Sequence, residues 1–299
     1  MDNVRVSIGL PVFNGEVYLE ETMDAILSQT YKQFELIICD NASTDATQEI
    51  CERYASQDPR IKYFRNATNL GAAANYNRTF ELSTGQYFRW SAHDDLIAPT
   101  YLELCVGVLD NNPDVILCYP GTVVIDACGN YLRDYRDGYH LPFSAPHARF
   151  REFFDIGDLC HPVFGLIRSN ILRQTILISN FPSSDRLLLG ELAMLGKSVE
   201  IPDRLAYRRV HPNNSIGPET TVEELQNWFD PRASMRGLSI RQRLFFEYLR
   251  AIRRVKPGGM ETLLCYYELF KFYILSSRNG KWSGYENEAR ARKRQGWFD

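Results

Sequence analysis

The sequence lacks the glycine patterns with which many proteins bind nucleotides. None of its 19 glycines forms a G-x-G triplet, and no G-x-x-x-x-G-K-[ST] segment occurs in the 299 residues. The first absence excludes the usual dinucleotide fingerprint, and the second excludes a P-loop. A nucleotide bound by this chain must therefore be held by carboxylates and a metal ion, because no glycine cradle is present.

Paired cysteines, a leader peptide and a long apolar run are also missing. The seven cysteines are odd in number and form no C-x-x-C pair, so neither a disulfide framework nor a zinc knuckle is indicated. The N-terminus has no basic start followed by an apolar stretch. The most apolar segment, residues 262–275, contains Glu268 and Lys271 and is shorter than the roughly 18 residues of a membrane span. These absences predict a soluble, cytoplasmic protein with reduced thiols.

A strong net charge is absent as well, although the charges are unevenly distributed. The formal net charge is −3 at pH 7, which argues against a general nucleic-acid binder. Residues 236–299 nevertheless contain 14 of the 34 basic residues and only 6 of the 37 acidic ones. The C-terminal segment is therefore basic, whereas the rest of the chain is acidic.

Short β-rich runs alternate with segments of helical period through the first half of the chain. The expected strands are Val4–Val12, Phe34–Asp40, Ile61–Arg65, Tyr87–Trp90 and Val115–Tyr119. The expected helices are Tyr18–Gln29, Asp45–Ala55, Ala72–Leu82 and Tyr101–Leu109. This alternation predicts an α/β fold with a mostly parallel sheet flanked by helices. Ligands bind at the carboxyl ends of the strands in such sheets, so polar residues at those ends are candidates for a site.

The second half of the chain is less regular and ends in two helical stripes. Residues 126–160 show no clear period, and a helix is expected again at Asp185–Leu195. Apolar residues recur at helical spacing over 240–255 and again over 260–274. We therefore expect an α/β domain over residues 1–217 and a basic helical extension over 218–299. The extension either packs on the domain or on a second subunit, as in a homodimer, or lies on an anionic membrane surface.

Acidic residues stand directly after two of the expected strands. Asp40 ends the second strand, where its carboxylate could bind a pyrimidine or a ribose, whereas Ser43 and Asp45 fit helix caps better. Asp94 and Asp95 follow the fourth strand, and two adjacent carboxylates suit a hard divalent ion such as Mg²⁺ or Mn²⁺. A solvated pair that caps the next helix is the alternative for these two.

Six motifs, which include the acidic residues just described, follow one another along residues 4–215. They are the opening block SIGLPVFNGEVYLEETMDAILSQTYKQFELIICDNASTDAT, Asn69-Leu70-Gly71 with Asn77, Gly85-Gln86-Tyr87, His93-Asp94-Asp95, Ser184-Asp185 with Leu188 and Gly196, and Tyr207 to Ser215. In order and spacing they resemble the inverting glycosyltransferases of family 2. A single match would be weak evidence, but six in the right order are strong evidence.

The resemblance implies a GT-A fold that binds a nucleoside-diphosphate sugar together with Mn²⁺ or Mg²⁺. By position, Asp185 would be the general base, Asp95 a metal ligand, and His211 a second metal ligand or a diphosphate contact. By the same resemblance, the residues expected to bind the donor substrate are Pro11, Phe13, Asn14, Glu16, Asp40, Asn77 and Asp94. Without the resemblance, Asp185 is more simply a helix N-cap and His211 a structural histidine.

Three positions differ from the family pattern. Ala92 replaces the first acidic residue of the commoner D-x-D-D form, and Ser184 replaces the usual acidic neighbour of the base. Tyr76 stands where an arginine often precedes the Asn77 position, so one cation expected near the phosphates is missing. Metal binding would therefore rest on the two aspartates after the fourth strand.

The sequence as a whole predicts a metal-dependent inverting glycosyltransferase. The family's habits imply a UDP- or dTDP-sugar donor and a glycan or lipid-linked acceptor, in surface-polysaccharide or glycolipid assembly. Two alternatives stay open, namely a nucleotidyltransferase that makes sugar nucleotides and a non-catalytic binding module. Cys160–Gly165 either lines a substrate pocket or forms a packed turn, and Trp90 is expected in the core.

Overall fold

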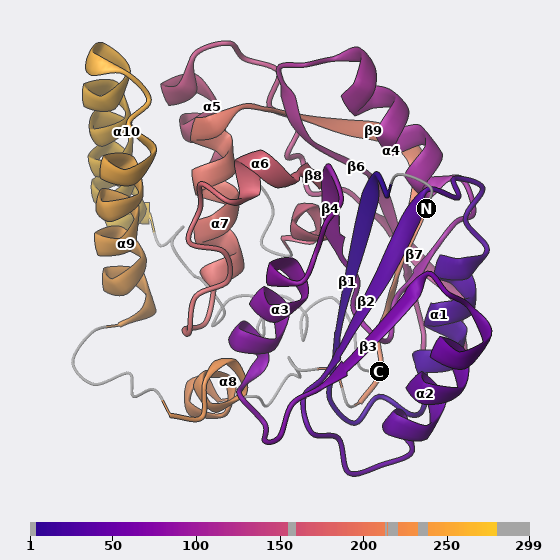
Figure 1. Cartoon of the computed structure of the whole chain (residues 1–299). Helices are drawn as coiled ribbons and strands as arrows, with labels where there is room; N and C mark the ends of the chain where they lie inside the picture. The colour runs from indigo at the N-terminus through magenta and orange to yellow at the C-terminus, as the bar shows by residue number, and fades with distance from the viewer. Residues whose placement is uncertain (1–3, 155–159, 213, 215–220, 233–238, 280–299) are drawn as a thin grey trace.

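The computed structural model describes residues 4–154, 160–212, 214, 221–232 and 239–279. Within these residues the strands form one nine-stranded sheet in the order β3-β2-β1-β4-β8-β6-β9-β5, and β7 pairs with β6. Helices lie on both faces of this sheet (Figure 1). The expected α/β fold, with a mostly parallel sheet flanked by helices, is therefore confirmed.

The first four strands of the parallel region lie where the sequence predicts them. β2 (Phe34–Asp40), β3 (Ile61–Arg65) and β4 (Tyr87–Trp90) have the expected bounds, and β1 (Val6–Val12) begins two residues late. β1 pairs in parallel with β2 and β4, and β2 pairs with β3. Every residue of β1 and β2 is buried, because helices cover both faces of the sheet.

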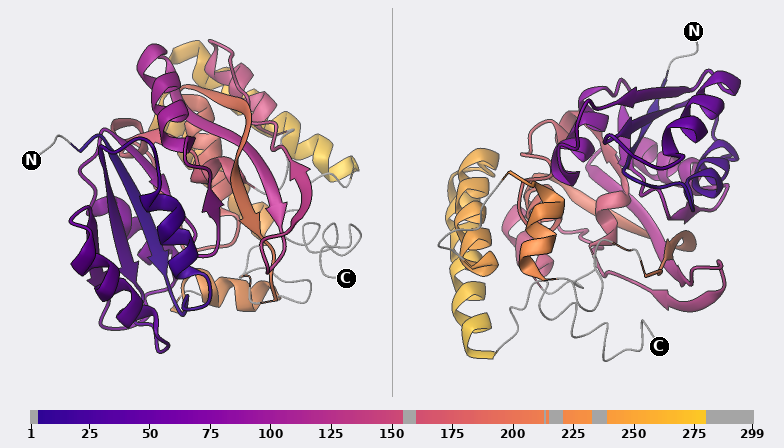
Figure 2. Two further views of the ribbon diagram at one scale, coloured as in Figure 1. Left: turned by 90° about the vertical axis from the view of Figure 1, so that its right-hand side faces the viewer. Right: turned by 90° about the horizontal axis from the view of Figure 1, so that it is seen from below.

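Helices divide the core into two layers. The first layer contains side chains of α1 (Leu19–Leu27), α2 (Thr47–Gln57) and α4 (Tyr101–Asn111). The second contains side chains of α3 (Ala72–Glu81) and α7 (Ser184–Leu195). Figures 1 and 2 show these two groups on opposite faces of the sheet.

Several elements that the sequence analysis did not assign complete the fold. β6 (Val115–Ile125) is longer than expected and pairs in parallel with β9 (Lys197–Arg209). β8 (Leu166–Arg168) lies antiparallel between β4 and β6, and β5 (Leu96–Ile97) pairs with the end of β9. The remaining elements of this half are β7 (Tyr131–Tyr135), α5 (Pro146–Phe153) and α6 (Ser169–Leu172). Because β5 and β9 are paired, the end of β9 lies beside the loop that follows β4.

Two helices of the C-terminal extension pack against the α/β body. α9 (Ile240–Val255) contacts α7, and α10 (Gly259–Asn279) contacts α5 and α9 (Figures 1 and 2). Tyr248 of α9 is 1% exposed, and a Cβ on Gly190 of α7 would stand only 2.6 Å from its ring. Buried residues of both helices share one core cluster with α7. The extension therefore packs on the domain, which is one of the arrangements that the sequence predicts.

The outward face of α10 is exposed to solvent. Its exposed apolar side chains are Met260, Leu263, Tyr267, Phe270, Ile274 and Leu275. In the part of the chain that the structure describes, no helix combines the length and apolar character needed to cross a membrane.

An ion pair with a buried carboxylate fastens α9 to α7, and we expect its removal to destabilise the fold. Glu191 is 0% exposed and accepts hydrogen bonds from Arg254 and from the Ile176 backbone N–H. In Arg254→Ala this carboxylate stays buried without its cation. The loss should be about 2–3 kcal/mol in the free energy of unfolding, below the ~3–5 kcal/mol of a fully buried pair, because the Arg254 side chain is 32% exposed. Urea denaturation followed by circular dichroism measures it.

The control for this experiment is Arg253→Ala, which removes an exposed guanidinium from the same turn of α9. It should change the free energy of unfolding by less than about 0.5 kcal/mol. Equal losses in the two variants would contradict the ion-pair explanation.

Candidate active site

A cavity of about 710 Å³ opens at the carboxyl ends of β1, β2 and β4. Its volume lies in the range of roughly 300–1,000 Å³ that is typical of ligand sites. Seven of the ten residues that the sequence assigns to a site line it, namely Pro11, Phe13, Asn14, Asp94, Asp95, Asp185 and His211. The fold thus brings residues from distant parts of the chain to one edge of the sheet.

The segment after β9 holds the Asp94 carboxylate. His211 Nε2 lies 2.9 Å from Asp94 Oδ2, and the Asn214 amide donates to the same oxygen at 3.1 Å. The Asn214 side chain also accepts from the His211 backbone N–H at 2.7 Å. Burial alone would raise the pKa of Asp94, but attraction by His93 and the hydrogen bond from His211 outweigh it and lower this pKa to about 2. Asp94 is therefore ionised at neutral pH.

Asp95 lies against Arg209, a fully buried arginine at the end of β9. The Arg209 backbone N–H donates to Asp95 Oδ1 at 2.9 Å. The Arg209 guanidinium donates to the Asp94 carbonyl oxygen at 3.0 Å and to Glu21 Oε2 at 2.7 Å. Burial and the charge of Asp94 together raise the pKa of Asp95 to about 7. An adjacent pair of this kind is stabilised by a further cation.

These carboxylates have the chemistry to hold a divalent ion, which would take its remaining ligands from a substrate. Among the described residues, no three His, Cys, Asp or Glu side chains gather into a preformed metal cage. Carboxylate oxygens are, however, the donors that Mn²⁺ and Mg²⁺ prefer, and Asp94 and Asp95 both line the cavity beside His211. Mg²⁺ in particular is commonly held by one or two carboxylates together with phosphate oxygens of the substrate.

Asp185 is the second residue of α7 and lines the same cavity. The helix begins at Ser184, and the residue before it, Ser183, is the N-cap with a φ of 67°. Asp185 is therefore not the N-cap that was the alternative. Its Oδ1 accepts the Arg186 backbone N–H at 2.8 Å. Burial raises the pKa of Asp185, which suits a carboxylate that has to take up a proton.

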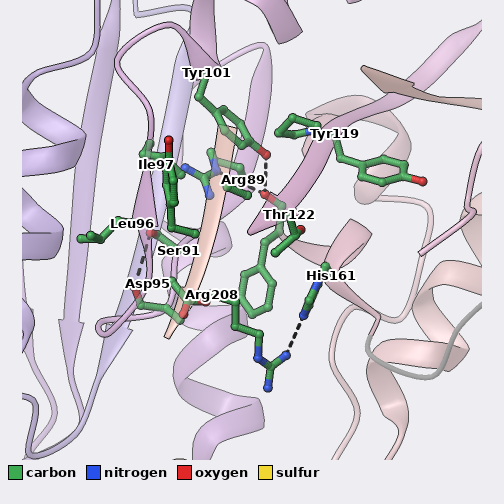
Figure 3. A pocket seen from close by; sticks show the side chains of 15 residues that line it. Arg89, Ser91, Asp95, Leu96, Ile97, Tyr101, Tyr119, Thr122, His161 and Arg208 are labelled. Atoms are coloured by element: carbon green, nitrogen blue, oxygen red, sulfur yellow. Dashed lines mark hydrogen bonds between the residues drawn. The ribbon is translucent and has the colours of Figure 1, made fainter. Parts of the chain in front are cut away.

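Arg208 of β9 is a cation to which the sequence analysis assigned no role. Its side chain lines the cavity and also a smaller adjoining one of about 30 Å³, shown in Figure 3. Arg208 Nη1 lies 2.9 Å from His161 Nε2, which must accept this hydrogen bond because a guanidinium only donates. The charge of Arg208 favours the ionised form of three cavity carboxylates, which are Asp94, Asp95 and Asp185. One arginine therefore acts on every aspartate of the candidate site.

Tyr76, at the position where the expected arginine is missing, lines the same cavity. Burial and the nearby aspartates raise the pKa of its phenol, so α3 presents a neutral hydroxyl there. The cation comes instead from Arg208, on a strand that was not predicted. Two signals in the sequence pointed to this cation, namely the missing arginine at position 76 and the motif from Tyr207 to Ser215, which contains Arg208.

Asp40 does not line the cavity. It is 0% exposed, and its carboxylate accepts hydrogen bonds from the Ser43 backbone N–H, the Tyr63 hydroxyl and Arg65. The next residue, Asn41, lines the cavity instead and donates to Asn69 Oδ1 at 2.8 Å. Asp40 thus fixes the loop after β2, and Asn41 presents the polar group.

Ser43 and Asp45 were expected as caps of the following helix, and for Ser43 this expectation is wrong. Ser43 Oγ accepts the Asn14 backbone N–H at 2.9 Å, and the N-cap of α2 is Ala46, without a side-chain cap. Asp45 accepts N–H groups from Glu16 and from the first turn of α2, both at 3.1 Å. The Glu16 carboxylate, which lies outside the cavity, accepts a hydrogen bond from the Ala46 backbone N–H. Ser43, Asp45 and Glu16 therefore link the loop after β1 to the loop after β2 through hydrogen bonds between side chains and backbone.

Asn77 and the Cys160–Gly165 segment support the cavity wall in different ways. The Asn77 amide, itself outside the cavity, bonds both ways with the Ile178 backbone at 2.8 and 3.0 Å. Ile178 lines the cavity. The segment forms a 3-10 turn, η1 (His161–Phe164), and several of its residues line the cavity, so it is both a packed turn and part of the wall. Trp90 is 0% exposed, which confirms its place in the core.

The sheet with its flanking helices has the GT-A glycosyltransferase fold. The chain belongs to glycosyl transferase family 2, whose sequence model matches residues 7–175. The resemblance seen in the sequence is therefore confirmed.

Two relatives illustrate the extent of the similarity. An uncharacterized glycosyltransferase of Haemophilus influenzae is 28% identical over 215 residues, which are 70% of this chain and 67% of the relative. One from Methanocaldococcus jannaschii is 30% identical over 176 residues, which are 58% of this chain and 59% of the relative. The chain thus spans about three fifths to two thirds of the length of these relatives.

Solved structures share the fold at low sequence identity. S. aureus TarS 1–349 in complex with UDP-GlcNAc superposes with a TM-score of 0.58 at 16% identity, covering 98% of this chain and 92% of the 1–349 chain. The mannosyltransferase PcManGT from Pyrobaculum calidifontis, in complex with GDP-Man and Mn²⁺, gives a TM-score of 0.54 at 16% identity. In that case 98% of this chain and 79% of the other are covered. These likenesses show the fold alone.

Proposed function

We propose that this glycosyltransferase transfers a sugar with inversion from a nucleoside-diphosphate donor, a UDP- or dTDP-sugar, to a hydroxyl of a glycan or lipid-linked acceptor. The observation that carries the proposal is the placement of Asp185, the Asp94–Asp95 pair and Arg208 around one cavity. A base and an anion-binding region are the two parts that such a displacement requires. Surface-polysaccharide or glycolipid assembly is the setting we propose.

In this reaction Asp185 acts as the general base. Inversion requires one displacement, in which the acceptor oxygen attacks the anomeric carbon as the bond to the diphosphate breaks. The acceptor hydroxyl must lose its proton during the attack, and a carboxylate with a raised pKa takes up that proton more readily than an ordinary one. No carboxylate is needed as a nucleophile, because the inverting reaction forms no covalent intermediate.

Arg208 and the paired aspartates serve the leaving group. Negative charge grows on the diphosphate as it departs, and Arg208 stabilises that charge from its place beside His161. A divalent ion held by Asp95, with Asp94 and His211 beside it, would supply Lewis-acid stabilisation to the same oxygens. The GDP-Man and Mn²⁺ bound to the related mannosyltransferase support this part of the proposal.

The loops after β1 and β2 form the nucleoside side of the proposed donor site. Pro11, Phe13 and Asn14 line the cavity, and we assign them to contacts with the base and ribose. Glu16 and Asp40 keep these loops in place through backbone hydrogen bonds and so act as positioning residues.

Thermal shift against UDP, dTDP, GDP and CDP, each with and without Mn²⁺, tests the proposed function. A ligand that binds only the folded state raises the midpoint of unfolding by mass action. We expect a shift of several degrees for UDP or dTDP that is larger with Mn²⁺. No shift with any of the four nucleotides would overturn the proposal and the assignment of Asp185 with it.

We further propose that residues 1–217 are the catalytic domain and residues 218–299 a helical extension that completes it. The cytoplasmic location, the membrane contact and the homodimer stay predictions. Some basic residues of α9 are engaged within the chain, since Arg243, Arg250 and Arg254 bond to Asn180, Glu247 and Glu191. Arg250 and Arg253 are nevertheless exposed, so a surface contact would draw on these residues as well as on the apolar face of α10.

A further inference from the structure

One wall of the cavity comes from α8 (Val222–Phe229), a helix beyond the residues that match the family. Glu224, Asn227, Trp228 and Pro231 line the cavity. Their spacing of three, four and seven residues places them on one side of the helix and its end. Trp228 is 39% exposed, although a large aromatic side chain is usually better buried.

The other side of α8 is anchored, so the position of this wall is fixed. Leu225 is 2% exposed and belongs to the core. Phe229, which is 4% exposed, belongs to the same core and also borders the cavity. The Gln226 amide donates to the Asn180 carbonyl oxygen at 2.9 Å, in the loop that leads into α7. Gly71 has a φ of 85°, and a Cβ there would stand 2.6 Å from the Phe229 carbonyl oxygen. The helix is thus held between the loop before α3 and the loop before α7.

The charges around the cavity separate its two sides. Among the described residues that line it, the basic side chains are His93, Arg208, Arg209 and His211, which come from β9 and from the loops after β4 and β9. None of them lies on α8, which contributes the carboxylate of Glu224 and the amide of Asn227. Asp94 and Asp95 lie among these basic groups, and we propose that they hold a divalent ion there. With that ion and the two arginines, an anionic diphosphate is favoured on the β9 side, and an uncharged group is favoured beside α8.

We propose that the α8 wall is the acceptor subsite and that its ligand is an uncharged sugar ring of a glycan, stacked on Trp228. A pyranose has one apolar face of C–H groups that packs on an aromatic ring, while its hydroxyls bond to carboxylate and amide groups. The inference rests on the proposed function, because an acceptor needs a donor. In the step it serves, the acceptor oxygen bonds to the anomeric carbon and its proton passes to Asp185. The bond to the diphosphate breaks, and the diphosphate leaves with the electron pair.

Saturation-transfer NMR on the full chain, with UDP and Mn²⁺ present, tests this subsite. The probes are methyl glycosides of glucose, galactose and N-acetylglucosamine, and citronellyl phosphate represents a phosphate-bearing lipid acceptor. We expect saturation of the ring protons of at least one glycoside and none of citronellyl phosphate. Trp228→Ala should weaken the binding of that glycoside at least tenfold. Trp228→Phe, which keeps an aromatic face, should weaken its binding less than threefold.

Phe246→Ala is the matched control, because Phe246 is an exposed aromatic residue on α9 outside the cavity. It should leave glycoside binding unchanged, and UDP binding should stay within twofold in all three variants. The inference is overturned if no glycoside binds, if Trp228→Ala does not affect binding, or if only citronellyl phosphate binds. Loss of UDP binding in Trp228→Ala would instead assign this wall to the donor. Absence of UDP binding by the unaltered protein would overturn the proposed function itself.

Discussion

Asp185→Asn is expected to lower kcat by about 10²–10⁴-fold, the contribution usual for a general base. Asparagine has nearly the same shape and can still accept the Arg186 backbone N–H through its amide oxygen, so the first turn of α7 should be preserved. The amide cannot accept the proton of the attacking hydroxyl. Steady-state transfer assays measure the loss, and binding of the nucleoside diphosphate, measured separately, should change less than threefold.

The pH profile gives this prediction a second, independent readout. Asp185 must be ionised to act, so activity should fall as the pH is lowered through its pKa. Because burial raises that pKa, the fall should occur at a higher pH than for an ordinary aspartate, whose pKa is about 3.9. The residual activity of Asp185→Asn should lack the part of the limb that belongs to Asp185 and keep any part that belongs to Asp95, whose pKa is about 7. A pH profile identical to that of the unaltered enzyme would contradict the assignment of Asp185 as the base.

Arg208→Gln is the second change with a large expected effect, a fall in kcat of about 10²–10³-fold. It removes the cation that we assign to the leaving diphosphate, so nucleoside-diphosphate binding should weaken as well. Arg208→Lys keeps the charge but not the planar group that reaches His161, and should restore activity only in part. Transfer kinetics and isothermal titration with UDP and Mn²⁺ measure the two effects.

A structural role alone would not reproduce the pH behaviour of this variant. The charge of Arg208 opposes the effect of burial on Asp185, so its removal should shift the acidic limb to higher pH. Arg204→Gln is the control, because Arg204 lies on the same strand, is 49% exposed and pairs with Asp134. It should leave both kcat and the limb unchanged. If Arg208→Gln behaves like the control, the diphosphate assignment is wrong.

The parallel part of the fold could be predicted from the sequence because its signals are local. The strand Phe34–Asp40 contains the apolar run Leu36–Cys39 and ends at a polar residue, and the helices between the strands have a clear 3.6-residue period. β9 was missed for the opposite reason. Its 13 residues include Pro202 and several charged groups, and only about a quarter of them are buried, so neither alternation nor an apolar run identifies it. Its pairing with β6 and β5 is a long-range effect.

For the site too, local patterns could be recognised in the sequence and long-range contacts could not. Motif spacing placed seven of ten assigned residues at the cavity, including both aspartates after β4 and Asp185. Motif spacing could not show that Asn41 rather than Asp40 lines the cavity. That depends on the packed loop, in which the Asp40 carboxylate accepts hydrogen bonds from Ser43 and Arg65. Motif spacing also gave no role to Arg208, whose importance depends on the end of β9 lying beside the β4 loop.

The sequence by itself thus determined the family, the α/β alternation and the acidic residues to which we assign the reaction. These follow from short-range patterns of apolar residues and from motif order, which need no tertiary contact to be recognised. The tertiary structure alone decided which cation faces the aspartates, which residue of a loop reaches the cavity, and that α8 forms a wall of it. Those features depend on contacts between residues far apart in the chain, and such contacts exist only once the core has packed.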